Sequence, residues 1–242
     1  MKLPEMIIFD YGDTLMREKN VDVQSAAQAL YSHIRLNPDA LDEEEVCSAF
    51  VELYLKAQSA VKGSGTDVHV ADVARLAFAG TGIELDIGYD ECELLVWNSA
   101  VKGEILPGAG AVLKLLNEKG IRSAVISNIS FSGESMRRRL NEYLPENRFE
   151  FIIASCDYVF KKPELLLFEA ALKKSGLSAE SVWFCGDSFN ADVKGASAAG
   201  IYPVWYNSGN RKPPDDAEKY NYCEIRSFAE LEKILRGDGE NA

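Results

Sequence analysis

The sequence predicts an α/β protein, a doubly wound parallel sheet interrupted once by an all-helical insert. From Pro107 onward, apolar strand-like segments alternate with amphipathic helical segments, which is the pattern of parallel β-α-β units. One further strand-like segment stands near the start of the chain, and helical patterns fill the roughly ninety residues that follow it. Polar residues come directly after several strand-like segments, where parallel sheets place their ligand sites.

The first predicted strand runs over residues 6–9 and is followed by Asp10. Ile7, Ile8 and Phe9 suit a strand that is covered on both faces, and residues 11–13 read as the loop that leaves it. A carboxylate at this position is a candidate for a functional site. An ordinary turn aspartate would look the same in this segment alone.

Residues 17–103 are predicted to form the helical insert. Asp42 and Glu45 resemble a capping box at the start of its longest helix. His33 and His69 are the only histidines and both lie in the insert. A metal-binding pair is one interpretation of them, but packed or solvated histidines are more common at such a separation. Apolar spacing places the helices at about residues 23–34, 41–61, 70–77 and 89–100.

The remaining core is predicted to comprise residues 1–16 and 104–242. Gly120 suits the left-handed position after a helix at 108–120, and Pro163 suits the first position of a helix at 164–176. The basic run Arg137–Arg139 reads as a solvated helix face. Further strands are expected at 121–127, 149–155, 182–187 and 201–206, and further helices at 191–200 and 228–235.

Composition excludes several classes of partner. The net charge is −12 and the pI about 4.8, which disfavours a nucleic-acid surface or an anionic membrane. The five cysteines are scattered without a CxxC pair, so we expect buried thiols in a reducing cytosol rather than zinc ligands or disulfides. With no cleavable leader and no long apolar segment, a cytoplasmic protein is expected. The oligomeric state is left open.

Polar residues at the predicted strand ends form an ordered series. It runs from Asp10 through Ser127 and Asn128 to Lys161 or Lys162, and ends at Asp187. Each has an ordinary explanation, because Ser, Asn and Gly-Asp form turns and lysine is usually solvated. Their joint occurrence in this order is much harder to explain by chance.

The motifs FDYGDTL, VISN, KKPELLLF and GDSFNAD strongly resemble those of the haloacid dehalogenase superfamily of hydrolases. The resemblance spans nearly the whole chain and is closest to the branch with a helical cap between the first two motifs. It implies a Rossmann-like core, with residues 17–103 as the cap. It also implies specific roles: Asp10 as nucleophile, Ser127 and Asn128 as phosphate-binding residues, Lys162 as the phosphate-neutralising cation, Asp10, Asp187 and the Gly12 carbonyl as Mg²⁺ ligands, and Asp192 as an outer acid.

The chemistry of these residues agrees with the resemblance. A phosphoryl group must be neutralised before the Asp10 carboxylate can approach it, and a hard cation bound to carboxylate oxygens can do this. Lys162 and Ser127 would stabilise the charge on the transferring group. Asp10 would become an aspartyl-phosphate that water hydrolyses.

Gly12 departs from the family pattern. In phosphatases of this family, the residue two after the nucleophile is a second aspartate that protonates the leaving group and then activates water. The nearest acid here is Asp13, and loss of a positioned acid/base costs about 10²–10⁴-fold in rate. Three interpretations follow. Asp13 reaches the leaving group through a shifted loop, or the enzyme uses substrates with good leaving groups or a water relay. In the third, the chain binds phosphates without useful turnover.

A magnesium-dependent phosphatase that acts on a small phosphorylated metabolite is the leading hypothesis. A phospho-ligand binding or regulatory protein is the non-enzymatic alternative, and Gly12 is its main support. A haloacid dehalogenase would also lack the second aspartate, but it needs no metal, and the acidic motif GDSFNAD weighs against it. A mutase, a phosphonatase and a receiver domain fit less well.

Overall fold

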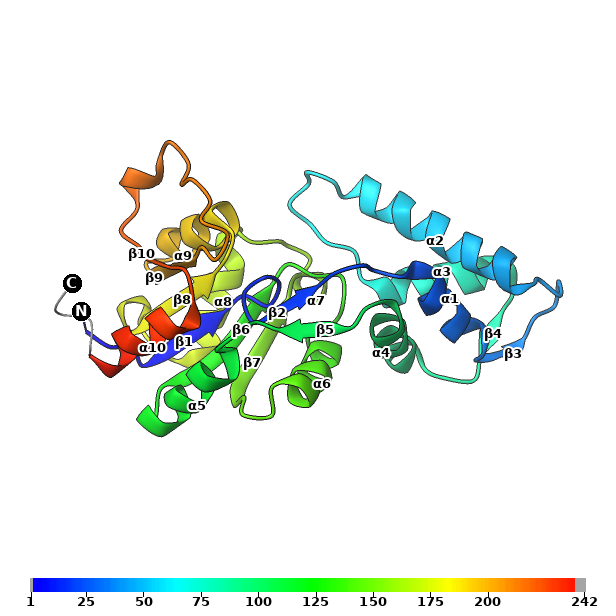
Figure 1. Ribbon diagram of the computed structural model, residues 1–242. Helices are drawn as coiled ribbons and strands as arrows, with labels where there is room; N and C mark the ends of the chain where they lie inside the picture. Colours follow the sequence, from blue (N-terminus) through cyan, green and yellow to red (C-terminus); the bar gives the residue numbers. More distant parts are fainter. Residues whose placement is uncertain (1, 238–242) are drawn as a thin grey trace.

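A six-stranded parallel sheet forms the centre of the molecule. The computed structural model describes residues 2–237 of the 242, and Figure 1 shows the arrangement of the elements. The strand order is β10-β9-β8-β1-β6-β7, so β1 lies between β6 and β8. This confirms the predicted parallel sheet. The strands are β1 (Met6–Phe9), β6 (Arg122–Ser127), β7 (Phe149–Ala154), β8 (Val182–Gly186), β9 (Tyr202–Tyr206) and β10 (Cys223–Ile225).

Helices cover both faces of the sheet because successive strand residues face opposite sides. Ile7 and Phe9 pack with α5 (Ala109–Lys119), α6 (Gly133–Tyr143) and α10 (Phe228–Arg236) on one face. Met6 and Ile8 pack on the other face, against α8 (Leu165–Ser175) and α9 (Lys194–Ala198). Burial on both faces explains why the central strands read as continuous apolar runs.

The insert folds around a hydrophobic core of its own. Leu30, Phe50 and Phe78 are buried within it, and the capping box of Asp42 and Glu45 is present. Figure 1 shows α1, α2 and α3 gathered at one end of the molecule, away from β8, β9 and β10. The helices are α1 (Val23–Tyr31), α2 (Glu43–Ala60), α3 (Val70–Thr81) and α4 (Tyr89–Ala100).

Short strands that the sequence pattern did not predict also occur in and beside the insert. β3 (Ile34–Leu36) pairs with β4 (Glu84–Leu85), so α1 ends before Ile34. β2 (Met16–Glu18) pairs with β5 (Gly103–Ile105) where the chain enters and leaves the insert. The Met16 side chain packs against Gly103, where a Cβ would lie 2.6 Å from Met16 Cε. Strands of two or three residues are too short to show a period of two.

Several helix boundaries differ from the predicted ones. α8 begins at Leu165, after the Lys162–Pro163 bond. The helix expected at 191–200 is a π-helical turn, Phe189–Val193, followed by α9. β10 was missed because only three residues pair with β9.

Arg139 corrects the interpretation of the basic run as a solvated face. It is 1% exposed, and its Nε donates to Glu18 Oε1 at 3.0 Å and to the Tyr11 hydroxyl at 3.3 Å. Its guanidinium carbon lies 5.0 Å from the centroid of the Trp97 ring. Because consecutive helical residues face different directions, one member of a basic run can be buried while its neighbours are not. Arg139 thereby joins α6 to β2, to α4 and to the residue after Asp10.

The cysteines are free thiols, and Cys47, Cys92 and Cys185 are buried as expected. Cys156 and Cys223 are only half-buried, which corrects the expectation for these two. In the part of the chain that the structure describes, no helix has the length and apolarity needed to cross a membrane.

Candidate active site

A cavity of about 270 Å³ opens at the carboxyl ends of the central strands. Asp10 follows β1, Ser127 ends β6 and Asp187 follows β8, so residues far apart in sequence meet at one edge of the sheet. The parallel arrangement of these three neighbouring strands is the reason. The predicted site residues all line this cavity: Asp10, Gly12, Asp13, Ser127, Asn128, Lys162, Asp187 and Asp192.

Asp10 is held by contacts on every side. It is 7% exposed, and its backbone N–H donates to the Cys185 carbonyl at 2.9 Å. Its Oδ1 accepts from Lys162 Nζ at 2.6 Å, and its Oδ2 accepts from Thr14 Oγ1 at 3.4 Å. The carboxylate therefore has a defined orientation in the cavity.

Lys162 occupies the site, and Lys161 does not. Lys162 Nζ lies 2.7 Å from Asp192 Oδ1 as well as beside Asp10. The Asn128 side chain accepts from Lys162 N at 2.7 Å and donates to Lys162 O at 3.0 Å. Asn128 was predicted to bind phosphate. In the structure its side chain contacts the backbone of Lys162, which that prediction did not include.

The site carries a surplus of negative charge. Carboxylate oxygens of Asp10, Asp187 and Asp192 lie within 4.8 Å of one another, and Lys162 is the cation among them. Burial raises the pKa of Asp10 above its usual range although Lys162 lowers it, and Asp192 adds to the rise. Burial opposes the charge on Lys162, but the two neighbouring carboxylates outweigh it and raise the pKa of Lys162. Oxygen ligands with excess negative charge suit a hard divalent cation.

Asp192 packs directly against the end of β8. A Cβ on Gly186 would lie 2.3 Å from Asp192 Oδ2, so β8 must end in glycine at this point. Asp192 Oδ2 accepts from Ser188 N at 2.9 Å, and the carboxylate is 2% exposed. The GDSFNAD segment therefore folds back so that its first and last acids face the same cavity.

Arg211 is a neighbour of the site that the sequence did not indicate. Its Nη2 lies 3.1 Å from Asp187 Oδ2 and donates to the Asp187 carbonyl at 2.5 Å. Asn207 holds the turn, because its Oδ1 accepts from Arg211 N at 2.8 Å. Burial and Asp192 raise the pKa of Asp187, and Arg211 opposes this rise. Arg211 lies in the segment that follows β9, whose sequence had no pattern that pointed to the cavity.

Gly12 and Asp13 differ in what their positions permit. A Cβ on Gly12 would meet no atom within 4 Å, and its φ is outside the left-handed region. Asp13 has a positive φ of 50° and a side chain that is 66% exposed. Its Oδ1 accepts from Arg17 Nε at 3.2 Å. The acid at position 13 therefore lies at the rim of the cavity and is paired with a cation on the surface.

Asp67 from the insert contacts both loops that carry site residues. Its side chain is 2% exposed and lies between α2 and α3 in sequence. It accepts from Ser155 Oγ at 2.6 Å and from Ser130 Oγ at 3.3 Å, and it pairs with Lys161 at 3.3 Å. Ser155 Oγ also accepts from Ile129 N at 2.8 Å. A single aspartate in a loop gave no sequence signal for this role.

The insert borders a second cavity of about 600 Å³. The end of α2, the segment 61–65 and the pair Lys161–Lys162 line it. Lys161 N donates to Gly65 O at 2.7 Å, and Asp67 N donates to Val159 O at 2.8 Å. Both cavities share Lys162, so the insert reaches the neighbourhood of the candidate site.

Comparisons with known proteins agree with this geometry. A glyceraldehyde 3-phosphate phosphatase of Methanothermobacter thermautotrophicus is 29% identical over 133 residues, which are 53% of this chain and 58% of that protein. The match thus spans little more than half of that phosphatase. The bovine (Bos taurus) haloacid dehalogenase-like hydrolase domain-containing protein 3 is 27% identical over 245 residues, 95% of this chain and 92% of that protein.

A solved structure supports the fold, and a family model identifies the family. The crystal structure of a phosphatase of this superfamily from Thermococcus onnurineus superposes with a TM-score of 0.60 at 21% identity, covering 96% of this chain and 98% of that one. The family model described as haloacid dehalogenase-like hydrolase matches residues 4–200. The chain therefore belongs to the haloacid dehalogenase-like hydrolases.

Proposed function

We propose that the protein is a magnesium-dependent phosphatase that hydrolyses a small phosphorylated metabolite through an aspartyl-phosphate on Asp10. The contact of the Asp10 carboxylate with Lys162, at 2.6 Å in a cavity that Asp187 and Asp192 also line, carries this proposal. The similarity to relatives named as phosphatases supports the prediction of a phosphoric monoester hydrolase. The small size of the cavity suits a phosphoryl group.

The residues present fit Mg²⁺. Asp10, Asp187 and the carbonyl of Gly12 would hold it, because they offer the oxygen ligands that Mg²⁺ prefers. The three clustered carboxylates exceed the one lysine charge among them. When bound, the cation would supply positive charge that offsets the charge of the phosphoryl group. Asp192, which accepts hydrogen bonds from Lys162 Nζ and Ser188 N, would orient the site residues without binding the cation directly.

The protein's own residues would carry out two displacement steps. Ser127 and Lys162 would bind the phosphoryl oxygens, while Asn128 would keep the Lys162 backbone in place. A carboxylate oxygen of Asp10 forms a bond to phosphorus as the ester P–O bond breaks, and the leaving oxygen takes up a proton. Water then attacks the phosphorus, which releases phosphate and restores Asp10.

Residues 17–103 would act as the cap over this site. The cavity between the end of α2 and Lys161–Lys162 supports this role, and so do the contacts of Asp67 with both site loops. A cap that closes over bound substrate excludes water and gives the pocket its selectivity. The substrate's non-phosphate part would therefore contact residues of the insert.

A phospho-ligand binding protein with weak turnover is the alternative that a specific observation favours. Gly12 supplies no side chain to the cavity, and the Asp13 carboxylate is exposed and paired with Arg17. A positioned acid for the leaving group is therefore absent from positions 12 and 13. This alternative shares the binding site and differs only in rate.

Asp10→Asn is expected to abolish phosphate release from an activated aryl phosphate and from a panel of phosphorylated metabolites. The amide is nearly isosteric but cannot form the aspartyl-phosphate, so the fold should persist while turnover is lost. Chelation of Mg²⁺ should have the same effect on the parent. Activity that survives both changes would exclude this mechanism, and metal-independent fluoride release from fluoroacetate would favour a dehalogenase.

Asp13→Asn is expected to change kcat by less than about threefold. The carboxylate is 66% exposed and its partner Arg17 is on the surface, and exposed ion pairs of this kind contribute about 0–1 kcal/mol. Steady-state kinetics on alkyl and aryl phosphates would measure this. A loss near 10²-fold, confined to alkyl phosphates with poor leaving groups, would instead identify Asp13 as the relocated acid.

A further inference from the structure

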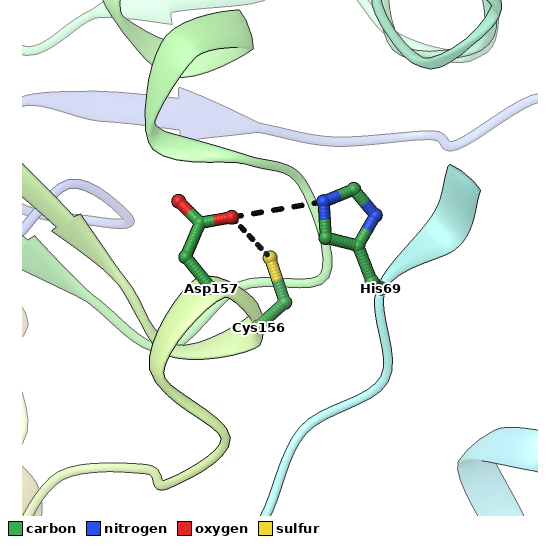
Figure 2. A group of neighbouring side chains, drawn as sticks. All are labelled: His69, Cys156 and Asp157. Atoms are coloured by element: carbon green, nitrogen blue, oxygen red, sulfur yellow. Dashed lines mark hydrogen bonds and ion pairs between the residues drawn. The ribbon is translucent and has the colours of Figure 1, made fainter. Parts of the chain in front are cut away.

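A second group of metal-ligating side chains lies where the insert meets the core. His69 precedes α3 of the insert, whereas Cys156 and Asp157 belong to α7 (Ser155–Tyr158) of the core. Figure 2 shows the three side chains converging, with dashed lines from one Asp157 oxygen to His69 and to Cys156. Their ligand atoms lie within 4.8 Å of one another, and the group shares no residue with the candidate active site.

The separations match those between ligands of one tetrahedral ion. His69 Nε2 lies 3.6 Å from Asp157 Oδ1, and Cys156 Sγ lies 3.8 Å from the same oxygen. Around tetrahedral Zn²⁺, the ordinary bond lengths place nitrogen and oxygen ligands about 3.4 Å apart, and sulfur and oxygen ligands about 3.6 Å apart. The two separations from Asp157 Oδ1 are thus within a few tenths of an ångström of these values, and the ligand atoms of His69 and Cys156 lie within 4.8 Å of each other.

The surroundings hold the group in place and add negative charge. Asp157 Oδ2 accepts from Gly133 N at 2.8 Å, which leaves Oδ1 facing His69 and Cys156. Glu93, whose side chain is 2% exposed, places Oε1 3.9 Å from His69 Nε2. Its oxygens accept from Ser132 and Ser135. Glu93 is thus a candidate fourth ligand, and water is the other.

We propose that His69, Cys156 and Asp157 form a binding site for a divalent transition-metal cation such as Zn²⁺, distinct from the active site. Imidazole, thiolate and carboxylate together are a ligand set for Zn²⁺ rather than for Mg²⁺. Because His69 comes from the insert and the other two from the core, a bound ion ties the insert to the core. The site would stabilise the arrangement in which Asp67 contacts both site loops.

Metal binding at this site should release a proton that can be measured. A cysteine thiol such as that of Cys156 is ordinarily protonated at neutral pH. The ion binds the thiolate, which releases one proton to solvent. Binding through Nε2 leaves the ring proton on Nδ1, and His69 gives up its contact with Ala71 N, which now donates to Nδ1 at 3.2 Å.

Co²⁺ titration of the reduced full-length protein tests the proposal. Excess Mg²⁺ would be present to occupy the active-site carboxylates. We expect one equivalent of Co²⁺ to produce a thiolate-to-cobalt charge-transfer band and the visible bands of tetrahedral Co²⁺. The Cys156 thiol should release one proton for each ion bound, and Zn²⁺ should displace Co²⁺ and raise the melting temperature.

Matched variants separate this site from other cysteines and from the active site. Cys156→Ser should lose the charge-transfer band and the proton release, and His69→Gln should weaken Co²⁺ binding by more than the roughly 10–100-fold typical of outer partners. Cys223→Ser, at another half-buried cysteine, and Asp187→Asn should keep the band. Absence of a thiolate band in the parent, or its persistence in Cys156→Ser, would overturn the proposal.

Discussion

Gly12→Asp is expected to raise kcat by about 10²–10⁴-fold, which is the contribution of a positioned general acid/base. A Cβ at this position meets no atom within 4 Å and the backbone is not left-handed, so a Cβ can be added without a clash or backbone strain. It would extend from the loop that follows Asp10, into the region where a leaving group departs. The gain should be large for alkyl phosphates and small for aryl phosphates, whose leaving groups need little protonation.

Two controls make the Gly12→Asp result specific. Gly12→Asn has the same size without a titrating acid, so its kcat should stay near that of the parent. Gly12→Asp combined with Asp10→Asn should be inactive, because the added acid cannot replace the nucleophile. Equal rates for Gly12→Asp and Gly12→Asn would show that the missing acid does not limit turnover.

Lys162→Met is expected to lower the free energy of unfolding of the metal-free protein by about 3–5 kcal/mol, the range for breaking a buried ion pair. Lys162 and Asp192 are each 2% exposed, and Asp10 is 9% exposed at its side chain. Removal of the ammonium leaves buried carboxylates without a compensating charge. Urea unfolding, with and without Mg²⁺, would measure the loss, and Mg²⁺ should restore more stability in this variant than in the parent.

The effect of Lys162→Met should depend on pH. Without the lysine, the pKa of Asp10 in the folded protein would rise further above its pKa in the unfolded chain. At any pH between these two pKa values, the folded state would bind more protons than the unfolded state. Stability then falls as pH rises through that window. The loss should be small near pH 4 and largest above pH 7.

Neighbouring substitutions provide the comparison for Lys162→Met. Lys161→Met removes a lysine whose side chain is 32% exposed, so its cost should be smaller. Lys162→Met with Asp192→Asn should recover part of the stability, because one unpaired charge is removed. An equal loss at both ends of the pH range would contradict the electrostatic explanation.

Local patterns predicted most of the core. The apolar runs of β1, β6, β8 and β9 were visible because nearly all of their residues are buried. The edge strand β7 was visible from its apolar residues although Glu150 is exposed. The capping box of Asp42 and Glu45 was visible because both residues lie within one helical turn. The alternation of strands and helices then implied a parallel sheet, and the sheet implied that residues after its strands share one edge.

Contacts between distant segments could not be predicted in this way. The burial of Arg139 depends on Glu18 and Trp97, which are far from α6 in the sequence and meet it only in the folded structure. The role of Asp67 depends on Ser155, 88 positions away. The preference for buried thiols over zinc ligands rested on the spacing of the cysteines, and spacing does not record that His69, Cys156 and Asp157 lie close together.

The sequence by itself determined the sheet, the insertion point of the helical segment and the series of polar residues after the strands, because each depends on the order of residues along a short stretch. The tertiary structure decided which of Lys161 and Lys162 enters the site, where Arg139 is buried, and that Asp67 contacts both site loops. These outcomes depend on which segments pack against one another. Local sequence periodicity carries no information about such packing.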